Sequence, residues 1–144
     1  MWQVGREERI EKVFSNQAIR LNPKYAYAYN NRGIAYYNQG EYEKAIVDLN
    51  EAIRLNPKYA YAYNSRGEVY RKQGKYEKAL ADYNQAIQLN PKYAHAYYNR
   101  GLIHKRNRNI EKARSDFKKA ADLYKQQGNQ KDYQDSLDQL RELQ

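Results

Sequence analysis

The chain has 144 residues and a net charge of +9, with 26 Lys and Arg against 17 Asp and Glu. This length suits a single domain. The sequence has no cysteine, which excludes disulfides, thiolate zinc sites and a cysteine nucleophile. It has only 2 Phe but 17 Tyr, so Tyr and Ala supply much of the apolar content.

A 34-residue repeat sets the order of the elements. The string Asn-Pro-Lys-Tyr-Ala recurs at Asn22, Asn56 and Asn90. An internal period of this length is typical of helical repeat proteins. It divides the chain into a partial unit (1–25), three full units (26–59, 60–93 and 94–127) and a tail (128–144).

The partial unit contains one expected helix, at 7–21, which aligns with the second helix of the full units. The first residues have no apolar core of a signal peptide, and no stretch of the chain approaches the ~18 apolar residues of a membrane span. We therefore expect a cytoplasmic protein without a membrane partner. The apolar face of the helix is partly uncovered, so the segment is a frayed end, a fragment of a longer array or a self-association surface; the face comprises Ile10, Val13, Phe14, Gln17 and Leu21.

Unit one is expected to form two helices, at 26–38 and 42–55. Gly40 suits the left-handed conformation just past a helix end, and Asn56-Pro57 ends the second helix. Apolar residues recur at helical spacing, and short helix pairs of this kind bury such a face only when they are stacked. Unit two repeats the pattern.

Unit three departs from this pattern. Arg108 replaces the Gly after the first helix, and Lys125 replaces the Pro, so the second helix is expected to continue to about Gln126. Gly128 then breaks the chain, and Asn129 with Asp132 is typical of a helix start. The pattern predicts a capping helix at 129–143, polar on its outer face.

Two ionisable residues recur at the repeat period. Arg occurs at 32, 66 and 100, and Asp at 48, 82 and 116. Because they follow the period of the fold, we expect each Arg to pair with an Asp in its own or the adjacent hairpin.

Tyrosines also follow the period. Eight of them fall at core-type offsets and are expected to build the core, namely Tyr29, Tyr36, Tyr42, Tyr63, Tyr70, Tyr76, Tyr83 and Tyr97. Three lie at junctions between units (Tyr25, Tyr59 and Tyr93), whereas Tyr124 and Tyr133 have no place in the pattern.

The sequence gives no sign of catalysis. His95 and His104 lie nine residues apart on one expected helix, about 180° from each other, and cannot share a metal ion. His-Glu-x-x-His and Gly-rich phosphate loops are absent from the sequence. We therefore expect neither an enzyme nor a metal or cofactor site, and His104 is expected to be packed in place of a core Tyr.

These motifs resemble the tetratricopeptide repeat family, whose unit has large, Gly, Tyr, Ala, large, Ala and Pro residues at fixed offsets. Unit one matches at Tyr29, Gly33, Tyr36, Ala45, Leu49, Ala52 and Pro57. The resemblance implies an all-α fold: a right-handed solenoid of antiparallel helix hairpins with a concave groove, forming one domain over 1–144.

The resemblance also implies where a ligand binds. In the family, the second, fifth, sixth, ninth, twelfth and thirteenth residues of each first helix line the groove. Asn there can bracket the backbone of an extended peptide, and Tyr supplies rigid apolar area. The corresponding residues here are Tyr27, Asn30, Asn31, Ile34, Tyr37, Asn38, Tyr61, Asn64, Ser65, Glu68, Arg71, Lys72, His95, Tyr98, Asn99, Leu102, Lys105 and Arg106.

We therefore expect a scaffold that binds a peptide segment of a partner protein in this groove. The basic residues at one end of it favour an acidic segment; they are Arg71, Lys72, Lys105 and Arg106. One branch of the family grips acidic chaperone tails through Lys, Arg and Asn side chains. Here none of its clamp positions matches; they hold Asn30, Ile34, Ser65, His95 and Asn99.

Two other functions are compatible with the sequence. Tyr27, Tyr61 and His95 recur once per unit and could stack on single-stranded RNA, although basic residues are scarce in unit one. Alternatively, units one and two differ at only 11 of 34 positions, which suggests an engineered or recently duplicated structural repeat with no dedicated ligand.

Overall fold

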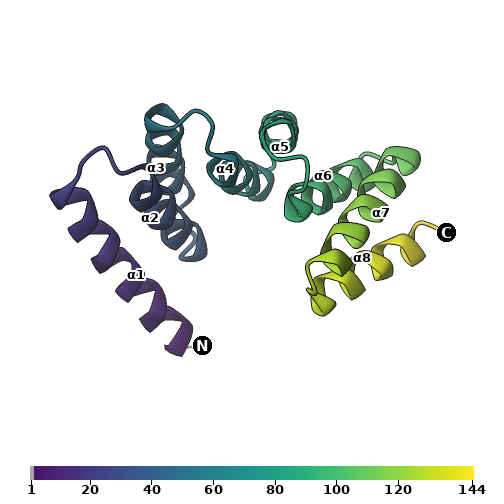
Figure 1. Cartoon of the computed structure of the whole chain (residues 1–144), viewed down its shortest axis with the longest axis horizontal. Helices are drawn as coiled ribbons and strands as arrows, with labels where there is room; N and C mark the ends of the chain where they lie inside the picture. The colour runs from purple at the N-terminus through teal and green to yellow at the C-terminus, as the bar shows by residue number, and fades with distance from the viewer. Residues whose placement is uncertain (1) are drawn as a thin grey trace.

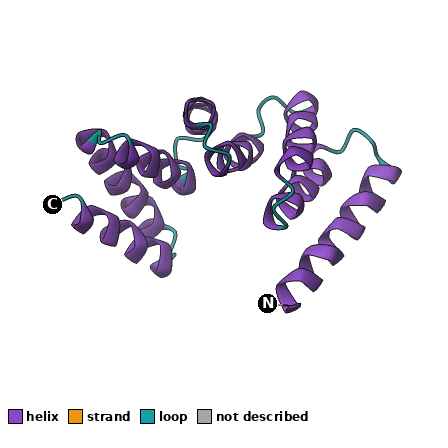
Figure 2. Cartoon of the chain, turned by 180° about the vertical axis from the view of Figure 1, so that it is seen from behind, coloured by secondary structure: helices purple, strands orange, loops and turns teal. Residues whose placement is uncertain are grey.

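The computed structural model describes residues 2–144, with side chains from residue 5 onward. The described chain is a succession of helices: α1 (Trp2–Leu21), α2 (Ala26–Asn38), α3 (Tyr42–Leu55), α4 (Ala60–Lys72), α5 (Tyr76–Leu89), α6 (Ala94–Arg106), α7 (Ile110–Gln126) and α8 (Gln130–Glu142). They form an arch with α1 and α8 at opposite ends (Figure 1). Short loops join successive helices (Figure 2), and the molecule is an all-α solenoid.

The expected helices of unit one are confirmed at both ends. The chain turns between units through the repeated Asn, whose side-chain oxygen accepts a hydrogen bond from the backbone N–H two residues later, over 3.1–3.2 Å at Asn22, Asn56 and Asn90. This local turn, together with the proline that follows, stops one helix and starts the next. The extension of α7 to Gln126 is also confirmed.

At each end of the described array a single helix packs against a complete hairpin, α1 against α2 and α8 against α7. Helix α1 starts at Trp2, five residues before the expected start. Its uncovered face is confirmed, since Ile10, Val13, Phe14 and Leu21 are 47–81% exposed. Helix α8 starts one residue later than expected, because Asn129 is its cap and accepts a hydrogen bond from the Asp132 N–H at 3.1 Å.

The helix ends within the hairpins need a left-handed residue, and unit three supplies it with a non-glycine. Gly40 and Gly74 have φ of 78° and 76°, and Arg108 has φ of 61° at the same repeat position. A Cβ in this conformation is strained by roughly 1–2 kcal/mol.

We therefore expect Arg108→Gly to stabilise the protein by about 1 kcal/mol, because relief of the strain exceeds the entropy that Gly loses on folding. Urea denaturation followed by circular dichroism measures the change. The matched control is Gly74→Ala, which introduces a Cβ at the same position of unit two and should destabilise by a similar amount. A loss of stability in Arg108→Gly would contradict this account.

The core combines alanines with larger side chains, and one repeat position holds a large residue in every full unit. Leu49, Tyr83 and Phe117 are fully buried and sit against Gly33, Gly67 and Gly101, where an added Cβ would come within 2.7–2.9 Å of the large side chain. These contacts explain why the repeat requires Gly at that position.

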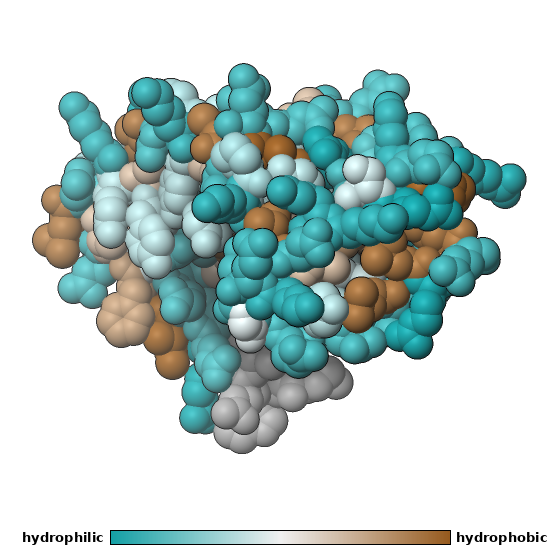
Figure 3. All heavy atoms as spheres, turned by 45° about the vertical axis from the view of Figure 1, so that its right-hand side comes forward, coloured by the Kyte–Doolittle hydropathy of each residue, from teal (hydrophilic) through white to brown (hydrophobic). Residues whose placement is uncertain are grey.

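On the face of the molecule that Figure 3 shows, hydrophilic residues predominate and hydrophobic residues form scattered groups.

The expectation of a tyrosine-built core is only partly correct. Of the eight tyrosines at core-type offsets, Tyr83 alone is buried, and the others are half-buried around the alanine clusters. Tyr124, which had no place in the pattern, is 2% exposed because α7 runs on and α8 packs beside it. Tyr93 is also buried, whereas Tyr25 at the first junction is exposed.

The repeated ion pairs are confirmed within each hairpin. Arg66 donates from Nε and Nη2 to the two carboxylate oxygens of Asp82, at 2.8 and 2.7 Å. Its Nη1 donates to Asn50 in the preceding hairpin at 2.9 Å. The same arrangement joins Arg32 to Asp48 and Asn16, and Arg100 to Asp116 and Asn84. Each Arg thus holds one hairpin closed and ties it to its neighbour.

Candidate functional site

Seven of the expected groove residues line two adjoining hollows over α2 and α4. The larger has a volume of about 510 Å³ and lies between α1 and α2; it is lined by Glu7, Glu8, Glu11, Tyr27, Asn31, Ile34, Ala35 and Asn38. The smaller, about 110 Å³, is lined by Ile34, Tyr37, Asn38, Leu49, Ser65 and Glu68. Ile34 and Asn38 line both, so the hollows form one continuous surface.

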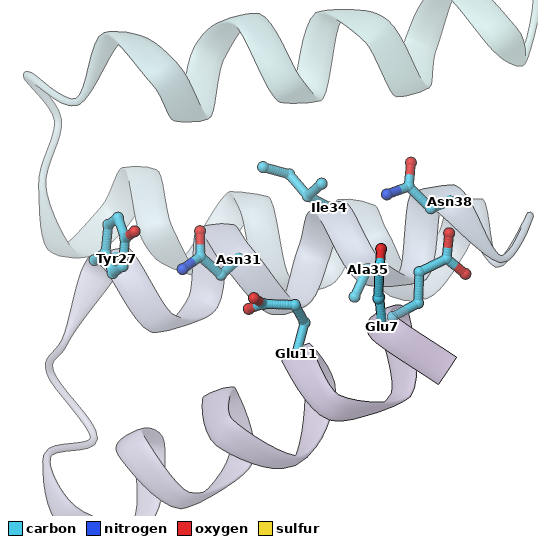
Figure 4. A pocket seen from close by; sticks show the side chains of 8 residues that line it. Glu7, Glu11, Tyr27, Asn31, Ile34, Ala35 and Asn38 are labelled. Atoms are coloured by element: carbon cyan, nitrogen blue, oxygen red, sulfur yellow. The ribbon is translucent and has the colours of Figure 1, made fainter. Parts of the chain in front are cut away.

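Carboxylates from α1 form one wall of the larger hollow, which the sequence analysis missed. Figure 4 shows Glu7 and Glu11 extending from α1 toward α2, along which Tyr27, Asn31 and Ile34 follow in order. One signal was available in the sequence. Glu11 occupies the repeat position of three fully buried alanines, Ala45, Ala79 and Ala113, and a carboxylate is out of place in such a core.

Three of the four Asn at the fifth and sixth groove positions, where peptide contacts were expected, are buried; Asn30, Asn64 and Asn99 are 2–8% exposed. Asn99 donates to the side-chain oxygens of Asn64 and Glu68 at 3.2 and 3.3 Å, and Asn64 also donates to Glu68 at 3.3 Å. These amides join α4 to α6 beneath the surface. Because the amide donors are occupied by these bonds, the exposed Asn38 and half-buried Asn31 are better placed to meet a ligand.

The groove residues of unit three are largely engaged with their neighbours. Lys105 donates to Gln139 at 2.8 Å and forms an ion pair with Glu142, both on α8. The Arg106 guanidinium lies over the Tyr76 ring of α5 at 3.9 Å. Tyr98 stacks edge-on against Phe117 and accepts a hydrogen bond from Gln139 at 3.5 Å, and Leu102 is half-buried.

Arg71 and Lys72 are therefore the most available cations of the expected basic cluster. Lys72 is exposed. Arg71 is half-buried, and its Nε has no hydrogen-bond partner among the described residues. That Nε is buried and out of reach of a ligand, but a carboxylate that meets the accessible part of the Arg71 guanidinium would gain a charge-assisted hydrogen bond.

A row of aromatic rings crosses the N-terminal ends of α4 and α6. Ring centroids are 4.9 Å apart for Tyr61 and Tyr93, and 5.1 Å apart for His95 and Tyr124. The Tyr124 hydroxyl lies 2.6 Å from His95 Nδ1. Burial and the neighbouring phenols raise the pKa of Tyr59, at the start of the row, to about 12. Tyr27 and Tyr61 are more than half exposed and offer ring faces to a ligand.

The side chains of the described residues bring no three His, Cys, Asp or Glu close enough to hold a metal ion. His95 and His104 contact different partners, since His104 lies 3.8 Å from Asp116. Among the described helices, none has the length and apolar character that crossing a membrane requires.

Comparisons with known proteins agree with the fold. Family models described as TPR repeat match residues 35–74 and 67–107, and models described as tetratricopeptide repeat match 14–47 and 94–127. A comparison with curated protein sequences gives no significant match.

Solved structures are similar over about four fifths of the chain. The crystal structure of MamA is 31% identical, with a TM-score of 0.71 over 80% of this chain and 67% of that one. The first TPR of Spaghetti (RPAP3), bound to the HSP90 peptide SRMEEVD, is 25% identical, with a TM-score of 0.73 over 82% and 89% of the two chains. The Arabidopsis OM64 TPR domain is 26% identical, with a TM-score of 0.72 over 81% and 94%. With family models matching most of its repeats, this chain belongs to the tetratricopeptide repeat family.

Proposed function

We propose that the protein is a non-enzymatic interaction scaffold that binds an extended peptide segment of a partner protein along α2 and α4. The observation that carries this proposal is the pair of adjoining hollows that share Ile34 and Asn38. Their lining combines an apolar floor with exposed amides, which suits a peptide whose side chains fill pockets while its backbone forms hydrogen bonds. The structure of the first TPR of Spaghetti with a bound HSP90 peptide supports peptide binding by this fold.

The charges around the two hollows favour one orientation of a bound peptide. Arg71 and Lys72 at the C-terminal end of α4 favour acidic residues, whereas Glu7, Glu8 and Glu11 on α1 repel them. Glu68 in the smaller hollow already accepts hydrogen bonds from Asn64 and Asn99. We therefore propose that the acidic part of the segment lies toward Arg71 and Lys72, and that its other end is neutral or basic.

Lys72→Glu should weaken binding of an acidic 12-residue peptide roughly tenfold, because it replaces attraction by like-charge repulsion. The peptides would come from a synthetic library and be titrated by fluorescence anisotropy, each beside a version with Glu changed to Gln. The matched control is Lys118→Glu, which makes the same charge change on an exposed residue of α7. Equal losses in the two variants would contradict a directed groove.

A second candidate function is single-stranded RNA binding, favoured by the exposed rings of Tyr27 and Tyr61. His95, the third ring of that set, is already bonded to Tyr124. A titration of labelled oligonucleotides across a salt series distinguishes the two functions, since phosphate binding gives a steep dependence on salt concentration.

A further inference from the structure

Unit three differs from the others at a repeat position that faces away from the candidate groove. Tyr36 and Tyr70 occupy this position in units one and two, and His104 occupies it in unit three. At about 100° per residue, His104 lies about 160° around α6 from the groove residue Leu102. The change therefore acts on the opposite face of the helix.

In units one and two the phenol ring at this position has two cations close to it, of which Lys44 and Lys78 occupy the same repeat position. The Tyr70 ring has Lys78 Nζ at 5.5 Å and Arg66 Cζ at 5.8 Å from its centroid. The Tyr36 ring has Lys12 and Lys44 at 5.1 and 5.7 Å. These distances lie within the range of favourable cation–π contacts, so the repeat holds a tyrosine ring in a frame of positive charge.

Unit three keeps both cations of unit two but has His104 where unit two has its tyrosine ring. Arg100 and Lys112 stand one period after Arg66 and Lys78, and both line a hollow of about 460 Å³. Its other lining residues are Leu80, Asn84, His104, Ser115 and Asp116, whose carboxylate is paired with Arg100. The imidazole is smaller than a phenol, and its position beside Asp116 leaves the space open.

The lining of this hollow is suited to an aromatic guest. Lys112 has no hydrogen bond, ion pair or ring contact with any described side chain, unlike its counterparts in the other units. Burial lowers the pKa of His104, and the nearby Arg100 and Lys112 act in the same direction against Asp116. The imidazole is therefore neutral near pH 7. Ser115 replaces the Ala81 of unit two and adds a hydroxyl group.

We propose that this hollow is a docking site for one tyrosine side chain of a partner polypeptide. The guest ring would lie between Arg100 and Lys112 as the Tyr70 ring lies between Arg66 and Lys78. The Ser115 hydroxyl and the Asn84 amide line the same hollow and offer hydrogen bonds to the phenolic oxygen. Unit two thus contains one filled example of the proposed complex, and in unit one Lys44, at the position of Lys112, also lies over the tyrosine ring.

The direct test is a titration with N-acetyl-tyrosine amide, followed by ¹H–¹⁵N NMR of the full chain. We expect saturable shifts confined to amides in 80–84, 100–104 and 112–116, with a Kd on the order of 1 mM for so small a ligand. 4-Methylcyclohexanol has a similar size but no π system, and should bind at least fivefold more weakly. Binding of free 4-methylphenol but not of the capped amino acid would overturn the assignment to a polypeptide.

His104→Tyr is the decisive variant, because it restores the repeat residue and fills the hollow with the chain's own ring. The variant should fold and lose at least tenfold in affinity for the tyrosine probe. Lys112→Ala should weaken binding several-fold, while Lys118→Ala, on an exposed residue of the same helix, should not. Unchanged shifts in His104→Tyr would overturn the proposal. Groove peptides should bind His104→Tyr as they bind the unchanged chain, so failure here is distinguishable from failure of the groove.

Discussion

Asp82→Asn should lower the free energy of unfolding by about 3 kcal/mol, because it leaves a guanidinium without its counter-charge in a partly buried site. The Asp82 side chain is only 6% exposed and accepts two hydrogen bonds from Arg66. An amide in its place presents one oxygen and two N–H donors, and those donors face the N–H groups of Arg66. Urea denaturation followed by circular dichroism measures the loss.

Two further variants separate this effect from a general effect of charge. Glu51→Gln removes a partner of Arg54 from an ion pair on the surface, with Nε and Oε2 2.9 Å apart. Its unfolding midpoint should not change measurably, because exposed pairs are screened by solvent. The double variant Arg66→Met/Asp82→Leu should recover most of the loss, since it leaves neither charge buried. Similar midpoints for Asp82→Asn and Glu51→Gln would show that the repeated pair does not hold the hairpin.

The helices and the ion pairs could be predicted because the same turn sequence and the same ionisable residues recur in three successive units. Asn-Pro-Lys at each junction specifies a turn that needs no tertiary contact. The pairing of Arg66 with Asp82 could be predicted because an Arg and an Asp recur at the same spacing in every full unit. Where the local chemistry of a residue and the repeat period indicate the same contact, the sequence alone is sufficient to predict that contact.

The prediction was weaker where a residue's surroundings depend on how adjacent units are rotated against each other. Asn64 and Asn99 lie on the face of the first helices that the family uses for ligands, yet the approach of α4 to α6 closes over them. Helix α1 corresponds to the second helix of a unit, whereas the family's groove positions lie on first helices, so its glutamates were not assigned to the hollow. Tyr124 lies beyond the point at which unit three stops following the repeat, so periodicity carried no information about it.

The repeat also predicts the outcome of changes at the large core residue of unit two. Tyr83 is fully buried, and Leu49 and Phe117 occupy its position in the neighbouring units. Its hydroxyl oxygen makes no hydrogen bond of normal geometry with a described residue. Burial raises the pKa of Tyr83 well above its usual value, and the nearby Arg71 opposes this rise. The ring therefore contributes by filling space against Gly67, whereas the hydroxyl is a buried polar group whose interaction with Arg71 does not reach normal hydrogen-bond geometry.

Tyr83→Ala should accordingly destabilise the protein by about 3–5 kcal/mol, through lost burial and the cavity left behind. Tyr83→Phe should be neutral or stabilising, because it keeps the ring and removes a group that pays for desolvation without forming a bond. Thermal and urea unfolding of the two variants measure both effects on one residue. If Tyr83→Phe destabilised the protein nearly as much as Tyr83→Ala, the hydroxyl oxygen rather than ring packing would stabilise this part of the core. Phe117, which has no hydroxyl and occupies the same position in unit three, argues against that result.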